Sequence, residues 1–398
     1  MASTPTAPPP TASPDPSASG VASGPIRVHP VSSRADRRAF IDLGYRLYDG
    51  VSAFVPPLRQ EVKKTLDPKK NPFFEHGRMQ LFLARDAQDQ VVGRIGAIIN
   101  GMHLNKYEDA TGFFGFFECV DDFAVARALL TEAEAWLRAQ GMRRVRGPAN
   151  PSLNDTCGLL VDGFERPPFL LMPYNPPYYE SLLARWGFET AMTMWAYYVH
   201  EKYVQTDKLK RGAQIVYRRN PGLQVRTLNL DRLYEEAELI RDIYNDAWSD
   251  NWGHVPMTEA ELRHLVDDLK QIVDKEIVYI LEDAGTPVAF AISLPNLNQA
   301  LSLIPDGRLF PTGLLKLLVY GDTVIDEIRM PLMGVRRAYH GRGLDAILIL
   351  ETIERGTAKG YHACEMSWVL DANKVLINAL DALGGVRDKR YVMLEKTL

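Results

Sequence analysis

The chain has 398 residues, of which 46% are hydrophobic and 24% are charged, a composition typical of globular proteins and unlike that of fibrous or wholly disordered chains. Its 46 basic and 50 acidic residues nearly balance, giving a net charge of −4, so the composition indicates no nucleic-acid partner. The three cysteines, Cys119, Cys157 and Cys364, are too few and too widely spaced for a disulfide framework or a Cys-x-x-Cys metal site. We therefore expect no metal.

The N-terminal segment and the hydropathy of the chain indicate where the protein resides. Residues 1–25 are mostly Pro, Ala, Ser, Thr and Gly, and because such a segment buries little apolar surface, we predict a disordered tail. It carries neither the basic region nor the apolar core of a secretion signal. No later stretch reaches the roughly 18 apolar residues of a membrane helix. We expect a cytoplasmic protein that makes at most peripheral contact with the inner membrane surface.

From Ile26 onward, short apolar runs alternate with helical periodicity, which indicates mixed α/β structure. The length suggests two domains, which we place at 26–200 and 201–398. The elements expected in the first are a helix at 40–47, a hairpin of strands 80–85 and 91–99, a strand at 113–119, a helix from Asp121 or Asp122 to Gly141, a strand near Val145 and a helix at 178–185.

The second domain repeats this order of elements. Expected are a helix from Leu233 to Tyr244, a helix behind the capping box of Thr258 and Glu261, a hairpin of strands 276–281 and 288–294, a strand at 328–335, a helix at 344–359, a strand at 362–369, a helix at 372–383 and a last strand at 390–394. The spacing of matching glycines fits if insertions occupy 147–173 in the first domain and 295–324 in the second. We therefore predict a structural duplication in which each domain is a mixed, mostly antiparallel sheet flanked by helices.

Residues 334–349, GVRRAYHGRGLDAILI, combine a strand end, a loop with Gly341 and Gly343, and an amphipathic helix. Backbone N–H groups and a helix N-terminus then converge on one point, which is an arrangement that binds phosphates. Arg336, Arg337 and Arg342 add positive charge, as a pyrophosphate ligand requires.

Together with the following HACEMSWVL and DANKVLINALDALGG segments, this loop resembles that of the GNAT acyltransferase superfamily. The family's Q/R-x-x-G-x-G/A pattern falls on residues 340–345, with Gly343 at the central glycine, and Asn373 precedes Gly384 as in the family's N-x10-G helix. The resemblance implies an acyl-CoA co-substrate and an amine acceptor. By this resemblance, the residues that contact acyl-CoA are Val335, Arg336, Arg337, His340, Gly341, Arg342, Gly343, Leu344 and Asn373.

Several positions depart from the family pattern. The tyrosine that often protonates the departing thiolate is replaced by Leu183 and Leu380, and Asp345 puts a negative charge beside the expected pyrophosphate. The first domain has DDFAVARALL at the matching loop, without glycines and with two acids, so we assign acyl-CoA to the second domain. His340 and Asp345 also fit the H-x4-D motif of glycerolipid acyltransferases, but the FPTG block precedes this motif here, whereas in that family it follows.

Catalytic candidates lie in the first domain. Glu118 ends the aromatic strand FGFFE, the type of position from which family members supply a general base, and Asp155 and Glu365 are rivals, although a buried structural hydrogen bond is the expected role of Glu365. The insertion at 147–173 and the residues after it are dense in polar side chains and rigid turns. Asn154 and Asp155 are accordingly predicted to be catalytic. The predicted substrate-binding residues are Asn150, Tyr174, Asn175, Tyr178 and Tyr179. His76 and His340 are expected to be structural, and Cys157 lacks the basic partner of a nucleophile.

Whole segments, among them DPKKNPFFEHG, GPANPSLND and LMPYNPPYYE, resemble a bacterial group of tandem GNAT-like proteins that includes bacterial ceramide synthases. That resemblance implies transfer of an acyl group to the amine of a lipid such as a sphingoid base. The apolar insertion at 295–324 fits an acyl-chain wall or a membrane-facing patch, or simply core. Two alternatives stay open: an N-acetyltransferase for a small molecule or protein, and a non-catalytic acyl-CoA or lipid-binding protein. No oligomeric state is predicted.

Overall fold

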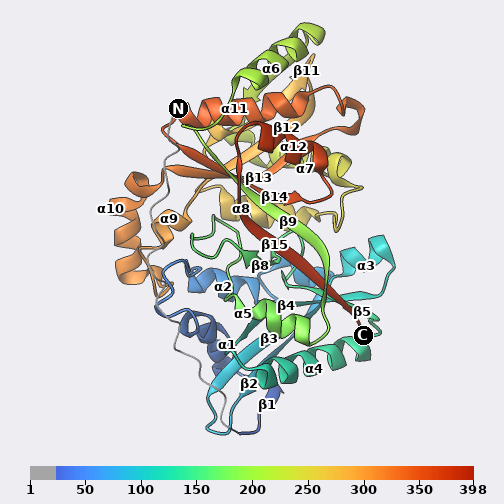
Figure 1. The fold of residues 1–398 in the computed structure, drawn as a ribbon, viewed down its shortest axis with the longest axis vertical. Helices are drawn as coiled ribbons and strands as arrows, with labels where there is room; N and C mark the ends of the chain where they lie inside the picture. Colours follow the sequence, from blue (N-terminus) through green and yellow to red (C-terminus); the bar gives the residue numbers. More distant parts are fainter. Residues whose placement is uncertain (1–23) are drawn as a thin grey trace, which may run out of the picture.

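The structure, a computed structural model, describes residues 24–398, so residues 1–23 of the predicted tail lie outside the described residues. One twisted sheet of 13 strands runs through both halves of the chain, and helices cover both of its faces (Figure 1). The α/β class predicted from the sequence is confirmed.

The strands are β1 (Arg27–Pro30), β2 (Arg78–Arg85), β3 (Val91–Ile99), β4 (Thr111–Cys119), β5 (Arg144–Gly147), β6 (Ala149–Asn150), β7 (Thr156–Cys157), β8 (Leu159–Asp162), β9 (Glu189–His200), β10 (Leu223–Thr227), β11 (Val278–Asp283), β12 (Thr286–Pro295), β13 (Glu327–Val335), β14 (Ala363–Leu370) and β15 (Val386–Thr397). The helices are α1 (Arg34–Arg46), α2 (Arg59–Thr65), α3 (Gly101–Tyr107), α4 (Phe123–Ala139), α5 (Tyr178–Arg185), α6 (Asp207–Arg219), α7 (Leu233–Trp248), α8 (Glu259–Leu269), α9 (Asn298–Leu301), α10 (Leu314–Val324), α11 (Leu344–Ala358) and α12 (Lys374–Ala382).

The order of strands across the sheet is β1-β2-β3-β4-β5-β15-β9-β14-β13-β12-β11-β10. Strands at equal positions from the two ends of the sheet, such as β1 and β10 or β4 and β13, are corresponding strands of the two halves. The order is therefore pseudo-symmetric about the β15–β9 pair. The last strand of each half lies beside the fifth strand of the other half, because β15 pairs with β5 and β9 pairs with β14. The halves thus exchange strands within one sheet, and the division near residue 200 stays a prediction.

Alternation along β2 explains how helices cover both faces. Leu81 and Leu83 pack with α1, whereas Phe82 and Ala84 pack with α4, because successive side chains of a strand point to opposite faces. In the second half, α11 and α12 cover one face and α7 covers the other. A third apolar layer, which contains Met194 and Tyr391 of the central strands, fills the space between the halves.

Two parallel strand pairs part along their length. β4 and β5 pair only from Thr111 to Phe113, and β13 and β14 pair only from Glu327 to Met330. Beyond these points each pair opens towards the carboxyl ends of its strands. In an open sheet such an opening is where a ligand can enter.

Most predicted elements are confirmed within a few residues, and both insertions lie where they were expected. The first contains β6, β7 and β8, and the second contains α9, the π turn η4 (Leu309–Gly313) and α10. The last strand was predicted too short: β15 has 12 residues, because it pairs with β9 along its length and with both β5 and β8 on its other side. Among residues 24–398, no helix is long and apolar enough to cross a membrane.

Candidate active site

The predicted phosphate loop of the second half connects β13 to α11 in eight residues. Gly341 and Gly343 both have positive φ, at 73° and 80°, a conformation that side chains other than glycine rarely adopt. Gly343 is the residue at which α11 begins. In the described part of the chain, the amides of Gly343, Leu344 and Asp345 have no backbone or side-chain acceptor, which leaves them available to an anion at the helix N-terminus.

The three arginines of this loop differ in their surroundings. Arg337 forms ion pairs with Asp246 (3.4 Å) and Asp250 (3.5 Å), so its charge is already compensated. The Arg336 side chain donates to the Pro287 carbonyl (3.0 Å). The exposed Arg342 stacks on the ring of Tyr339 at 4.5 Å and forms no ion pair within residues 24–398. Arg342 is therefore the guanidinium best placed to meet a phosphate.

The remaining predicted contacts of acyl-CoA have structural roles of their own. The His340 ring bonds to the Val335 carbonyl (2.8 Å) and ties the loop to the end of β13. The Leu344 side chain is buried in the core. Asn373 caps α12 by accepting from the Leu376 N–H (3.1 Å). Asp345 forms no ion pair with Arg342, so this arginine does not neutralise its negative charge.

The matching connection in the first half is closed to an anion. It has only three residues, between β4 and α4. Asp122 caps α4 by accepting from the Ala124 N–H (2.7 Å). A carboxylate thus takes the place at the helix start that a phosphate would need, and the assignment of acyl-CoA to the second half stays a prediction.

The opening between β4 and β5 in the first half contains a small, partly open cavity. Its lining is Arg94, Phe114, Phe116, Phe117, Glu118, Pro148, Asn150, Gly158, Leu159, Pro173, Tyr174, Asn175, Tyr179 and Leu183. Aromatic and aliphatic side chains form most of this wall, and Glu118 with Arg94 gives it one charged end.

Glu118 is held by three donors. Its carboxylate accepts from the hydroxyls of Tyr48 (2.9 Å) and Tyr179 (2.7 Å), and Arg94 approaches it at 3.5 Å. Burial raises the pKa of Glu118, while Arg94 and the two hydroxyls act in the opposite direction. The side chain is only 14% exposed, so Glu118 is not a solvated strand end.

The predicted substrate residues gather at this cavity, with one exception. Asn150 lines it and accepts from the Phe116 N–H (2.6 Å), and Asn175 lines it with its amide bonded to both backbone groups of Leu160. Tyr174 and Tyr179 also line it. Tyr178 does not, because its hydroxyl donates to the Cys119 carbonyl (2.8 Å).

Sequence reasoning missed Tyr48 and Arg94 as partners of Glu118. Tyr48 follows α1, so nothing in its spacing connects it with a strand 70 residues away. Arg94 could have been identified from the sequence, because it is the one charged residue in the otherwise apolar strand VVGRIGAII. A buried charge requires a partner, and Glu118 is that partner.

The strand register identifies what the second half has in place of this pair. Arg94 lies opposite Glu118 in β3 and β4, and Phe290 lies opposite Gly334 in β12 and β13. A Cβ on Gly334 would meet the Phe290 ring at 2.7 Å. The second half therefore has an aromatic ring where the first has an ion pair, and it has no carboxylate of its own at this position.

Glu118 and the phosphate loop are also far apart. β4 and β13 are separated by five strand spacings, or about 24 Å at roughly 4.8 Å each. The two predicted parts of one reaction centre thus lie in different halves, one at each opening (Figure 1).

Asn154 and Asp155 lie at the second half, although they belong to the first. The Asn154 amide donates to the Val255 carbonyl (3.0 Å) in the connection between α7 and α8. Trp248, the last residue of α7, donates from its indole to the Met333 carbonyl (3.0 Å) on the open part of β13. The insertion therefore contacts the α7–α8 connection of the second half through Asn154.

Asp155 is an exposed residue of this insertion. Its carboxylate accepts from the Ser152 N–H (3.2 Å). Desolvation, followed by the charge of Glu261, raises the pKa of Asp155 to about 7.

Other candidates have structural explanations. Glu365 accepts from the Ser367 hydroxyl (2.6 Å) and lies 3.7 Å from the buried Arg329, and His76 bonds to Glu261 across the halves (2.9 Å). Burial raises the pKa of the Cys157 thiol to about 12, which leaves no thiolate for attack.

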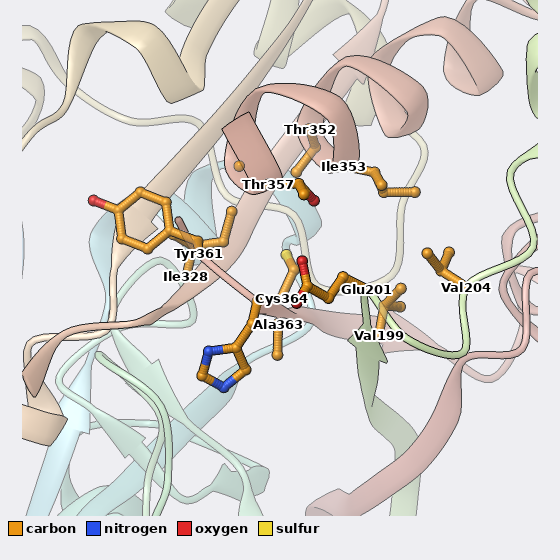
Figure 2. A pocket seen from close by; sticks show the side chains of 12 residues that line it. Val199, Glu201, Val204, Ile328, Thr352, Ile353, Thr357, Tyr361, Ala363 and Cys364 are labelled. Atoms are coloured by element: carbon orange, nitrogen blue, oxygen red, sulfur yellow. The ribbon is translucent and has the colours of Figure 1, made fainter. Parts of the chain in front are cut away.

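A further hollow lies at the C-terminal half of α11, where Glu201, Thr357 and Cys364 gather (Figure 2). Its lining on α11 runs from Thr352 to Thr357, about 13–21 Å from the phosphate loop at about 1.5 Å per helical residue. It is therefore not part of that loop's site.

A helix N-terminus with free amides beside an opened pair of parallel strands is the arrangement that the predicted GNAT fold requires. Solved tandem structures agree with this fold. A tandem GNAT protein from the clavulanic acid biosynthesis pathway matches 94% of this chain and 98% of its own, with a TM-score of 0.55 and 12% identity. A GCN5-related N-acetyltransferase from Sphaerobacter thermophilus matches 94% and 95%, with a TM-score of 0.51 and 11% identity.

Sequence comparison identifies the family. The chain is 37% identical to a bacterial ceramide synthase from Caulobacter vibrioides, over 94% of this chain and 98% of that one. It is 35% identical to the protein YghO from Escherichia coli K12, over 92% and 94%. No protein-family model matches the chain. The chain belongs to the family that contains these two relatives, as its sequence segments indicated.

Proposed function

We propose that the protein transfers an acyl group from acyl-CoA to the amine of a long-chain lipid, such as a sphingoid base. The observation that carries the donor assignment is the loop at residues 336–343, whose two glycines have positive φ and whose helix start presents unpaired amides. The lipid acceptor is supported by the name of the Caulobacter relative. The aromatic and aliphatic surfaces between the halves also suit an apolar substrate.

In this proposal the reaction takes place at the β13–β14 opening. The amides at the start of α11 and the guanidinium of Arg342 hold the phosphates. The amine nitrogen attacks the thioester carbonyl carbon, so that a C–N bond forms and the C–S bond breaks. Asp155 accepts the proton that the amine loses, and the departing sulfur takes a proton from water, because leucines replace the family tyrosine.

Asp155 is preferred to Glu118 as the base because of position and pKa. It lies beside the α7–α8 connection of the half that has the phosphate loop, and its pKa of about 7 matches the pH at which a general base works best. Glu118 is about 24 Å away by strand spacing, and its charge is already shared with Arg94 and two hydroxyls. Glu118 would be the general base only if acyl-CoA bound in the first half.

Thiol release by the purified full chain tests the proposal, with acyl-CoAs from acetyl to palmitoyl and longer, each with and without a sphingoid base. Release that requires both a long chain and the base is expected. Release from acetyl-CoA with a polar amine would instead favour an N-acetyltransferase for small molecules or proteins. Acyl-CoA binding without thiol release in any arm would favour a non-catalytic acyl-CoA or lipid-binding protein. That alternative is tested because leucines occupy the family tyrosine positions and Asp345 is unpaired.

A further inference from the structure

The second insertion exposes an apolar surface. Phe310, Leu315, Leu318 and Val319, here called the α10 patch, are 68%, 63%, 75% and 55% exposed. These four residues lie within ten positions of the chain, whereas other exposed large apolar residues are mostly scattered. Leu315, Leu318 and Val319 share one face of α10 because residues three and four apart are neighbours on a helix.

No other element of the described chain covers this face. The main contacts of α10 are with η4 and α9, and α10 lies at the periphery of the molecule, away from the sheet (Figure 1). An exposed, contiguous apolar surface on a folded protein marks an interaction site.

A basic segment begins where the chain is hydrogen-bonded to the turn before the α10 patch. The Arg59 N–H donates to the Gly307 carbonyl (2.9 Å), and this bond joins the start of α2 to the turn before η4. Residues 59–70 and 306–319 together contain seven basic and three acidic residues, although the whole chain has a net charge of −4. Lys63, Lys69 and Lys70 are exposed and have no ion-pair partner in the part of the chain that the structure describes.

We propose that the α10 patch and the basic segment 59–70 form a docking surface for an anionic lipid bilayer. An apolar helix face enters the boundary between headgroups and acyl chains, and lysines beside it are attracted to anionic headgroups. The inference goes beyond the proposed reaction and rests on it in one respect: a lipid amine would be drawn from a membrane.

Vesicle flotation of the full chain tests the docking surface. The protein is expected to float with vesicles of phosphatidylcholine and phosphatidylglycerol, and less with phosphatidylcholine alone or at high salt, since salt screens surface charge. Leu318→Gln is expected to lower the partition coefficient about tenfold, because one buried leucine is removed from the bilayer. Val375→Gln is the matched control, since Val375 is equally exposed at 75% but lies on α12. It should float as the wild type does.

Changing the charge tests the second component. Lys69→Gln and Lys70→Gln are each expected to lower binding about fivefold on anionic vesicles and to leave binding to neutral vesicles unchanged. Absence of wild-type flotation, or an equal loss in Leu318→Gln and Val375→Gln, would overturn the proposal. So would a dimer in analytical ultracentrifugation that Leu318→Gln dissociates, because the patch would then bind a second copy. Flotation requires no turnover, so its outcome is independent of whether the acyltransferase proposal holds.

Discussion

The two openings of the sheet have the same strand topology but different loops and functional side chains. The second-half opening has an eight-residue loop with free amides at a helix start, and a phenylalanine ring fills the position of a carboxylate. The first-half opening has a buried carboxylate, an arginine and two tyrosine hydroxyls, and an aspartate caps the helix where a phosphate would bind. The same strand order can thus support two different sites, because function resides in the side chains and loops placed on it.

This comparison also explains why the insertion at 147–173 matters. Neither opening alone has both an anion site and a free carboxylate near neutral pKa. Asn154 joins the insertion to Val255 of the second half. In the proposed mechanism the insertion therefore supplies Asp155 as the base of the half that lacks one, so the reaction would depend on both halves.

The largest expected effect comes from Asp155→Asn, which removes the base and keeps an acceptor for the Ser152 N–H. We expect kcat to fall at least about a hundredfold, the typical loss of a general base. In the wild type the base must be deprotonated, so kcat should rise with pH through about 7 and level off above it. This rise should be absent in Asp155→Asn.

Glu261→Gln is the control for the assignment of this pKa. Glutamine keeps the capping box with Thr258 and removes a charge that raises the pKa of Asp155. The pH midpoint should therefore move below about 7, while the plateau rate stays close to that of the wild type. An unchanged kcat in Asp155→Asn would remove Asp155 from the mechanism.

A smaller effect on rate is expected from Gly343→Val. Its Cβ would lie 3.0 Å from Val216, at a φ of 80°, and forcing a β-branched residue into this conformation costs about 1–3 kcal/mol or displaces the loop. We expect the KM for acyl-CoA to rise about tenfold or more, with a smaller change in kcat. Steady-state kinetics at saturating amine measure the effects on KM and kcat separately.

Gly360→Val supplies the comparison at the other end of α11. Gly360 has a φ of 90° and open space around it, so the backbone strain is alike, but it is distant from the loop. It should lower thermal stability without raising KM. Equal KM values for the two variants would place the donor elsewhere.

Much of the fold could be predicted from the sequence because local signals determine it. Capping residues such as Asp122 and Thr258, the glycines that end helices and the apolar runs of β2 and β3 fix the elements within a few residues. The exchange of β9 and β15 could not be predicted, because pairing between strands almost 200 residues apart leaves no mark on either strand's pattern.

The site was predictable in parts. The glycines of the phosphate loop and the carboxylate at the end of β4 follow from residue types at known positions. The roughly 24 Å between them does not, since spacing along the chain says nothing about the order of strands in a shared sheet. The contact of Asn154 with Val255 of the other half is likewise revealed only by the folded chain.

The last prediction concerns the first-half opening and separates a structural ion pair from a reaction centre. Glu118→Gln removes the charge opposite Arg94, which is itself buried, and an unpaired buried charge costs about 3–5 kcal/mol. We expect the free energy of unfolding to fall by about that amount in urea titrations, while kcat and the KM for acyl-CoA change little. The double variant Arg94→Met with Glu118→Leu should lose less than the sum of the single variants, because both charges leave together. If Glu118→Gln instead lowered kcat a hundredfold and left the stability unchanged, the reaction centre would lie between β4 and β5, and the roles of the two openings would be reversed.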